Sequence, residues 1–397
     1  MSTIPEDYVY LDWAATTPLC AEAAEAMAPY MAPGPRNICV NGNANSLHSV
    51  GRAAFAAMED ARARIARALH AARPAEIVFT SGATEADNLA LLGITDALVA
   101  RRHADEPPAK VITTAIEHDA VLSCLPRLRA RGVEVVELAP DAHGMIGIDA
   151  LRAALDDRTV LVSVMLANNE MGAVQDVAAL AAAAHESGAL FHTDATQALG
   201  KVPIDLGALG VDAASFSAHK VCGPKGIGAL YLKTRTPLTP LVVGGGQEAG
   251  QRSGTQNVAG MAGFAAAVQA AADRQPAEAA RERALRDGLY AALAALPGVR
   301  PAVAVPAGST DYLPNIVDVT VDGMESETLI LRLDIAGFAV SGGSACSTGS
   351  LDPSHVLSAL GIPRDRALGA LRISFGRFTD EDELVRFVEA FRRAVGR

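Results

Sequence analysis

Apolar and polar residues alternate along this chain in blocks. Between about residues 50 and 235, short runs rich in Val, Ile and Phe are separated by longer segments with apolar residues every three to four positions. Such short runs predict strands buried on both faces, and the longer period predicts amphipathic helices. The predicted strands are 76–80, 110–114, 133–138, 160–166, 190–194, 213–217 and 228–232, and the predicted helices are 53–69, 85–101, 120–131, 148–155 and 177–187. This alternation predicts an α/β domain around a seven-stranded, mainly parallel sheet, with an antiparallel member among the last two strands.

The pattern changes near residue 235. A Pro/Thr-rich stretch at 234–240 and three glycines at 244–246 predict a loop. Two helices are expected next, at 258–274 and 277–295, because Gln275-Pro276 should break a continuous helix. Strands at 316–321, 338–341 and 372–375 then alternate with helices at 326–335 and 380–395, the last starting in a capping box of Asp380 and Glu383. This part predicts a second, smaller α+β domain.

Composition narrows the class of protein. Half of the 397 residues are apolar and 20% are charged, which is typical of a globular chain. The net charge of −11 disfavours binding to nucleic acid or to anionic membranes. The chain starts without a basic leader segment and has no charge-free apolar stretch of about 20 residues. Five cysteines with no C-x-x-C pair exclude a disulfide framework and a structural zinc site. We therefore expect a soluble protein of the reducing cytoplasm.

Polar residues gather where predicted strands end, which is where open α/β sheets bind their ligands. The segment Thr80–Glu85 leads from a strand through a small-residue turn into a helix, so its free N–H groups and hydroxyls suit a phosphate; plain helix caps are the alternative. Asp194 ends a buried strand and needs a partner, either a cationic ring nitrogen of a cofactor or the N–H groups of a helix start.

Lys220 follows the strand 213–217 and precedes a Gly/Pro loop. A lysine in that place has little room to reach solvent, so desolvation should lower its pKa and favour imine formation. A surface lysine on a loop is the alternative. Ser217 and His219 beside it offer hydrogen-bond donors for a phosphate.

Taken together, these residues resemble the class V aminotransferase group of pyridoxal-phosphate (PLP) enzymes, and within it the cysteine desulfurases of the NifS/IscS type. The resemblance covers nearly the whole chain. It rests on the Asp194 and Lys220 motifs and on YLDWAATTP (10–18), GNANSLH (42–48), SGATE (81–85), EHDAV (117–121), NNEMG (168–172), GGGQE (244–248), QRSGT (251–255), SACS (344–347) and LRISFGR (371–377). The implied fold is the PLP-dependent transferase fold type I, with a large PLP-binding domain at 16–256 and a small domain formed by 1–15 and 257–397.

The resemblance also implies a role for each matching residue. Lys220 would bind PLP covalently, Asp194 would pair with its ring nitrogen, and His118 would stack on the ring and relay protons. Gln197 and Asn169 would bind near the phenolic oxygen, and Asn169 would also face the substrate. Ala83, Thr84, Ser217 and His219 would hold the phosphate, joined by Thr255 of a second subunit in a homodimer. Arg372, assisted by Asn43, would bind the substrate carboxylate.

Cys346 is the predicted sulfur-accepting nucleophile. Its surroundings, residues 341–350, are almost wholly small and polar, which predicts a mobile loop with an exposed thiol. The resemblance implies that sulfur from L-cysteine is transferred to Cys346 as a persulfide, that L-alanine is released, and that an iron–sulfur scaffold or another acceptor protein then takes the sulfur. No metal-ligand set is evident. The other four cysteines, Cys20, Cys39, Cys124 and Cys222, suit structural positions.

Two residues depart from the family pattern. Trp13 stands where Tyr or Asn is common, and Cys222 stands where an aromatic residue is frequent. We expect Trp13 to affect packing near the cleft and Cys222 to be incidental to the chemistry. A selenocysteine lyase, and a non-catalytic sulfur-relay partner with the same fold, are the alternative functions. A transaminase is disfavoured because it has no use for a mobile thiol.

Overall fold

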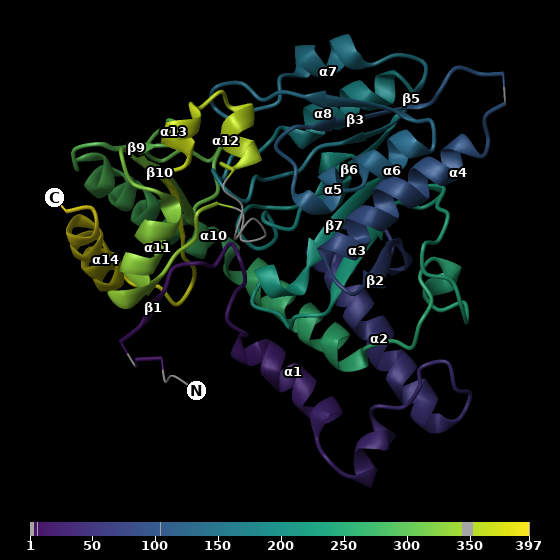
Figure 1. The fold of residues 1–397 in the computed structure, drawn as a ribbon. Helices are drawn as coiled ribbons and strands as arrows, with labels where there is room; N and C mark the ends of the chain where they lie inside the picture. Colours follow the sequence, from purple (N-terminus) through teal and green to yellow (C-terminus); the bar gives the residue numbers. More distant parts are fainter. Residues whose placement is uncertain (1–3, 6, 104, 344–351, 397) are drawn as a thin grey trace.

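A seven-stranded sheet forms the centre of the larger part of the molecule (Figure 1). The computed structural model describes residues 4–5, 7–103, 105–343 and 352–396, so Cys346 lies outside the described residues. The strands follow the order β2(Ile77–Thr80), β8(Gly228–Leu232), β7(Ala213–Ser217), β6(Leu190–Asp194), β5(Thr159–Ser163), β3(Lys110–Thr114) and β4(Glu134–Leu138). Only β8 runs antiparallel to its neighbours. The predicted mainly parallel sheet, with one antiparallel member, is confirmed.

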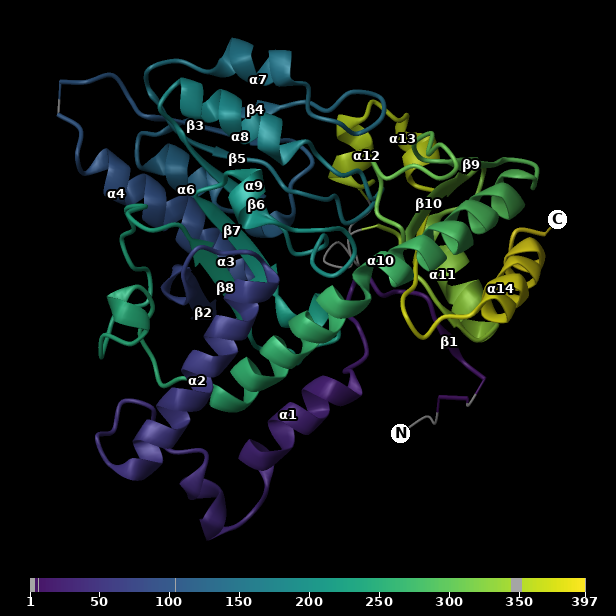
Figure 2. The same cartoon turned by 180° about the vertical axis from the view of Figure 1, so that it is seen from behind.

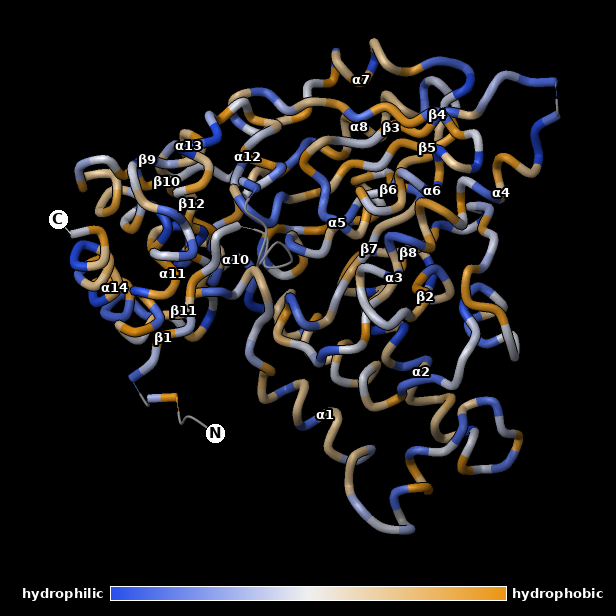
Figure 3. The backbone as a smooth tube through the Cα atoms, viewed as in Figure 1, coloured by the Kyte–Doolittle hydropathy of each residue, from blue (hydrophilic) through white to orange (hydrophobic). Residues whose placement is uncertain are grey.

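Both faces of this sheet are buried by helices, as continuous apolar strands require. Successive side chains of β2 point to opposite faces, with Ile77 and Phe79 in one core and Val78 in the other. The first core is completed by α2, α8 and the first half of α10, and the second by α3 and the helices that follow β3. Figure 3 shows the apolar residues gathered along the strands of the sheet.

The helices match most of the predicted segments and add several short ones. Around the large sheet lie α1(Ala21–Met31), η1(Pro35–Cys39), α2(Ser49–Ala68), η2(Pro74–Glu76), α3(Ala83–Asn88), η3(Leu89–Ile94), α4(Thr95–Val99), α5(Asp119–Leu122), α6(Leu125–Ala130), α7(Ile148–Ala154), α8(Val177–Glu186), α9(Leu206–Leu209), η4(Ala218–Lys220) and η5(Glu248–Gly250). Among the helices that the structure describes, none is both long and apolar enough to cross a membrane.

The expected break at Pro276 is wrong. One helix, α10(Val258–Ala294), passes through Pro276 and connects the two parts of the molecule (Figure 2). An interior proline removes one backbone hydrogen bond and disfavours the helix, but packing on both sides of it keeps the helix continuous. Met261 and Phe264 are buried against the large sheet, whereas Leu289 and Leu293 are buried in the second core.

The second part is the predicted α+β unit. It has the antiparallel strands β12(Ala370–Ser374), β10(Ile316–Val321) and β9(Val299–Pro301), the small parallel pair β1(Val9–Tyr10) and β11(Phe338–Ala339), and the helices α11(Ser326–Ile335), α12(His355–Ala359), α13(Arg364–Ala367) and α14(Glu381–Ala394). The capping box of Asp380 and Glu383 at the start of α14 is confirmed. Strand β1 brings the N-terminal segment beside β11, so residues 12–16 reach the space between the two parts.

Candidate active site

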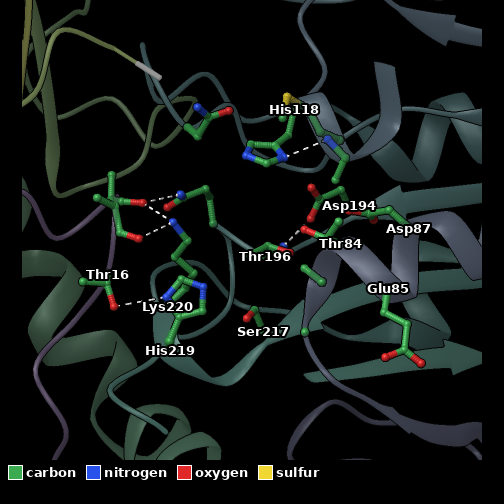
Figure 4. A pocket seen from close by; sticks show the side chains of 18 of the residues that line it. Thr16, Thr84, Glu85, Asp87, His118, Asp194, Thr196, Ser217, His219 and Lys220 are labelled. Atoms are coloured by element: carbon green, nitrogen blue, oxygen red, sulfur yellow. Dashed lines mark hydrogen bonds between the residues drawn. The ribbon is translucent and has the colours of Figure 1, made fainter. Parts of the chain in front are cut away.

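A cavity of about 490 Å³ lies at the carboxyl ends of β6 and β7. Figure 4 shows Lys220 and His219 on one side of it, Asp194 and Asp87 on the other, His118 above and Ser217 below. Ten of the predicted site residues line this one cavity: Ala83, Thr84, His118, Asn169, Asp194, Gln197, Ser217, His219, Lys220 and Arg372. They come together because parallel strands present their carboxyl ends at the same edge of a sheet.

Lys220 is held at both its side chain and its backbone. It ends η4, directly after β7, and its Nζ donates to the carbonyl oxygen of Ala15 at 2.8 Å and to that of Ala14. The Nζ of Lys201 donates to the carbonyl oxygen of Lys220 itself. Burial lowers the pKa of Lys220 to about 8, and the charge of Arg372 acts in the same direction. About a tenth of this amine is therefore unprotonated and nucleophilic at pH 7, far more than for an exposed lysine.

Asp194 ends β6 and is only 6% exposed. One of its carboxylate oxygens accepts the N–H of Thr196 at 2.9 Å, so the turn after the strand fixes the side chain. Gln197, one turn further, donates from Nε2 to the carbonyl oxygen of Ala14 at 2.9 Å. Both alternatives for Asp194 therefore fit: it caps the local turn and also lines the cavity.

His118 stands at the start of α5 on the side of the cavity opposite Ser217. Its Nδ1 accepts the N–H of Ala120 at 3.1 Å, which in a neutral imidazole places the proton on Nε2. Burial lowers the pKa of His118, with the charge of Asp194 opposing the shift. A neutral ring is suited to stacking and to passing a proton.

The turn before α3 forms a candidate phosphate cradle. Ala83 and Thr84 begin α3, whose first N–H groups have no partners within the helix. Ser217 lies across from the turn, since a Cβ added to Gly82 would stand 3.9 Å from its Oγ. His219 contacts Thr16 through Nδ1 at 3.1 Å, and burial lowers the pKa of His219 to about 4. Its neutral ring can donate one hydrogen bond to an anion.

Arg372, 2% exposed on β12, has two of its three guanidinium nitrogens engaged. Nη1 donates to the carbonyl oxygen of Asn169 at 2.8 Å and Nη2 to Asp12 at 2.9 Å. Nε is buried without a partner among the described residues. A carboxylate is the ligand that such a positioned guanidinium edge binds best.

Two predicted residues lie outside the cavity. Thr255 and Asn43 are both exposed and are absent from its described lining. Thr255 belongs to residues 241–257, which we call the strap because they contact α2 through Glu248 and lead into the start of α10. The predicted nucleophile Cys346 lies outside the described residues.

Several buried or half-buried groups around the site escaped the sequence reasoning. Asp12 pairs with Arg372, Asp87 lines the cavity from α3, and Glu117 lies between β3 and His118. Asp12 and Glu117 fall inside the motifs YLDWAATTP and EHDAV, but Arg372, which pairs with Asp12, and Met165, whose N–H binds Glu117, are distant in sequence. Asp87 lies three residues after Thr84, one turn along the same helix, and this spacing was the available signal.

The lining of the cavity fits PLP. Besides Nε of Arg372, the amide oxygen of Asn169 and the hydroxyl of Thr196 are buried without partners among the described residues. Unpartnered buried polar atoms are uncommon unless a ligand or water satisfies them. An amine of lowered pKa, a carboxylate, neutral imidazoles and a phosphate cradle match the groups of this cofactor.

Comparisons with known proteins agree with the assignment of PLP to this cavity. Residues 9–387 match the family described as Aminotransferase class-V. The "Cysteine desulfurase IscS" of Serratia proteamaculans is 42% identical over 391 residues, covering 98% of this chain and 93% of that protein. That of Dictyoglomus turgidum is 39% identical over 388 residues, covering 98% and 94%.

Among solved structures, a "NifS-like protein" matches with a TM-score of 0.88 at 35% identity, covering 98% of this chain and 99% of that one. "SspA in complex with cysteine" matches with a TM-score of 0.78 at 33% identity, covering 94% and 100%. With a family match over nearly its whole length and relatives of about 40% identity, the chain belongs to the class-V aminotransferase family.

Proposed function

We propose that this chain is a PLP-dependent cysteine desulfurase that converts L-cysteine to L-alanine and passes the sulfur onward. One observation carries the proposal: Lys220 and Asp194 face each other across one cavity, with Arg372 at its edge, in a chain whose relatives of similar length are named cysteine desulfurases. PLP, when bound, supplies an electron sink for the electron pair left at the substrate Cα. The protein has to bind, orient and move protons.

The positions of the side chains support a separate role for each of them. Arg372 binds the substrate carboxylate, with Asn169 beside it, and Asn43 assists from its exposed loop. Asp194 would provide the negative charge that pairs with the cofactor's ring nitrogen, and His118 would stack on the ring. Ala83, Thr84, Ser217 and His219 hold the phosphate, and Gln197 lies near the phenolic oxygen. The amine of Lys220, with its pKa of about 8, takes up the Cα proton and returns it.

Sulfur transfer requires a thiolate, and we assign this role to Cys346. The bond between the substrate Cβ and its sulfur breaks as a bond forms between that sulfur and Sγ of Cys346. The carbon skeleton keeps the electron pair of the broken bond and gains protons to become alanine. Cysteine and a thiol thus give alanine and a persulfide, with no external oxidant or reductant.

The test is to incubate the purified protein with L-cysteine and to measure alanine and sulfide together. The Cys346→Ser variant should release little of either, and Cys39→Ser, which removes an exposed thiol, should match the wild type. Equal alanine release from Cys346→Ser would exclude the persulfide route. Continued turnover of selenocysteine by Cys346→Ser would favour a selenocysteine lyase instead.

We also propose a homodimer in which Thr255 completes the phosphate site of the second subunit. Thr255 is exposed and outside its own cavity, and apolar side chains nearby are exposed as well, including Leu47 (90%) and Val243 (77%). As partners and location we propose an iron–sulfur scaffold or another sulfur acceptor in the reducing cytoplasm. The four described cysteines are free thiols.

A further inference from the structure

Two carboxyl groups line one side of the cavity and a third is buried near them, although the mechanism uses only one of the three. Asp194 is 6% exposed, and Asp87 on α3 and Glu117 before α5 are fully buried. Asp87 and Asp194 both line the cavity, and Figure 4 shows them on the same side of it. Three negative charges so close together in a dry site would repel one another strongly, so their protonation states must differ.

Asp87 has no compensating cation in its described surroundings. Both of its carboxyl oxygens are buried and neither has a hydrogen bond of good geometry among the described residues; the hydroxyl of Ser215 is the polar group that faces them and lowers the pKa of Asp87 in part. The nearest basic group is the fully buried His192, whose Nε2 stands 3.7 Å from Oδ1 of Asp87. Both ring nitrogens of His192 already bind hydroxyl groups, those of Ser163 at 2.9 Å and Ser215 at 3.0 Å. This arrangement suits a neutral imidazole, which offers Asp87 no charge.

The other titratable groups that face Asp87 are acidic. Asp194 comes from β6, Glu117 from the segment before α5, and the thiol of Cys124 from the N-cap position of α6. Burial and the charge of Asp194 raise the pKa of Asp87 well above its usual value, and burial raises that of Glu117 to about 8. Burial lowers the pKa of His192 to about 3. In their neutral forms Asp87 and Glu117 place no further negative charge beside Asp194.

We propose that Asp87 is a positioning residue that stays protonated in the folded protein and supports Asp194, so that Asp194 would be the one anion that pairs with the cofactor's ring nitrogen. A protonated carboxyl is a hydrogen-bond donor, whereas a carboxylate only accepts. The part played by Asp194 rests on the function proposed above. The protonation of Asp87 does not, because it follows from burial and neighbours present without cofactor.

The variant Asp87→Asn tests which protonation state Asp87 has in the folded protein, because an amide resembles a neutral carboxyl in shape and can also donate a hydrogen bond. Above a pKa of about 3.9, an aspartate of the unfolded chain is ionised. If Asp87 is protonated in the folded protein, the wild type therefore takes up one proton when it folds. The protonated carboxyl of Asp87 then stabilises the folded wild type at low pH, and this stabilisation is lost as the pH rises. The side chain of Asp87→Asn does not titrate, so the variant does not lose stability in this way.

The first measurement is the thermal unfolding midpoint of the cofactor-free protein between pH 5 and pH 8. Asp87→Asn should unfold at a higher temperature than the wild type, with a gap that widens as the pH rises. The matched control Asp60→Asn removes an exposed carboxylate and should show no widening. Parallel curves for wild type and Asp87→Asn would overturn the proposal, and loss of cysteine turnover would leave this measurement unaffected.

The second measurement uses PLP added to the same proteins. Asp87→Asn should keep the wild-type absorption spectrum and its pH dependence, while Asp194→Asn should change both. Asp87→Leu, which removes the polar group beside Asp194, should lose bound PLP about tenfold more readily than Asp87→Asn, the effect expected when a charged group loses one polar neighbour. A spectrum of Asp87→Asn that shifts like that of Asp194→Asn would mean that Asp87 is an anion.

Infrared spectroscopy provides an independent check if Asp87→Asn fails to fold. The carbonyl stretch of a protonated carboxyl should be present in the wild type at neutral pH and reduced in Asp87→Leu. An unchanged band in that variant would overturn the proposal.

Discussion

Individual side chains at this site owe their chemistry to burial more than to their identity. Lys220, His118 and His219 all have lowered pKa values because their charged forms are poorly solvated there. The sequence predicted this for Lys220 from the buried strand before it. It did not predict that the carbonyl groups of Ala14 and Ala15, more than 200 positions away, would hold the amine.

Covalent capture of PLP by the cofactor-free protein should report the pKa of Lys220. Only the unprotonated amine attacks an aldehyde, so the rate should rise about tenfold per pH unit below pH 8 and level off above it. The visible absorbance of the product gives the rate. An exposed lysine, with a pKa of about 10.4, would give a rate still rising at pH 9, and this outcome would contradict the assignment.

Arg372→Lys should weaken cysteine binding while keeping the positive charge. The planar guanidinium contacts Asn169 and Asp12 at once, and an ammonium cannot reproduce this geometry. We expect KM for cysteine to rise about 10- to 100-fold, the effect of a lost charge-assisted hydrogen bond or two, with a smaller change in kcat. Arg377→Lys, at a residue outside the cavity lining, is the matched control. A KM unchanged in Arg372→Lys would remove Arg372 from carboxylate binding.

The helices and strands predicted from the sequence agree with the structure wherever the contacts that stabilise them are local. All seven strands of the large sheet were predicted within a few residues, because continuous apolar runs are readable one segment at a time. The break at Pro276 was wrong, since its cost is local but the packing that offsets it comes from two separate cores. Strand β1 was missed because its partner β11 lies over 300 residues away.

A buried ion pair connects the strap to helix α2, which packs on the large sheet. Arg62 on α2 contacts both carboxylate oxygens of Glu248, at 2.7 and 2.9 Å, and Glu248 also accepts the N–H of Phe79. Arg62→Ala leaves a buried carboxylate without its partner and should lower the free energy of unfolding by about 3–5 kcal/mol. Denaturant titration measures this loss.

The double variant Arg62→Met with Glu248→Gln should recover much of that stability, because it buries no unpaired charge. If the single and double variants were equally destabilised, packing of the Arg62 side chain over the ring of Phe79, rather than charge, would hold the strap.

At the scale of the whole molecule, the two parts meet at the cavity. Asp12 and Arg372 come from opposite ends of the chain, and Asn169 comes from the loop that follows β5 of the large sheet. The strap and the loop at 41–48 contact each other through Gln256 and Asn45, at 3.1 Å. These two segments carry the exposed apolar residues Leu47 and Val243, which form the proposed dimer surface.

Val243→Asp should therefore favour the monomer. An unpaired charge buried in an interface costs about 3–5 kcal/mol, so the dimer dissociation constant should rise by a hundredfold or more. Sedimentation equilibrium measures it. Ile335→Asp, at an 88% exposed residue of α11, should have no effect. An unchanged dissociation constant for Val243→Asp would place the interface elsewhere.

The sequence by itself determined the α/β class, the strand sequence of the large sheet and, through its motifs, ten residues of the cavity. These features depend on local apolar patterns and on short segments at strand ends. Only the tertiary structure decided the single helix α10, the pairing of Asp12 with Arg372 and the burial of Asp87 and Glu117 beside Asp194. Each of these features depends on groups that the fold brings together from distant parts of the chain. The extent to which a charged group loses its water is set by all of these groups together, so the local sequence cannot predict it.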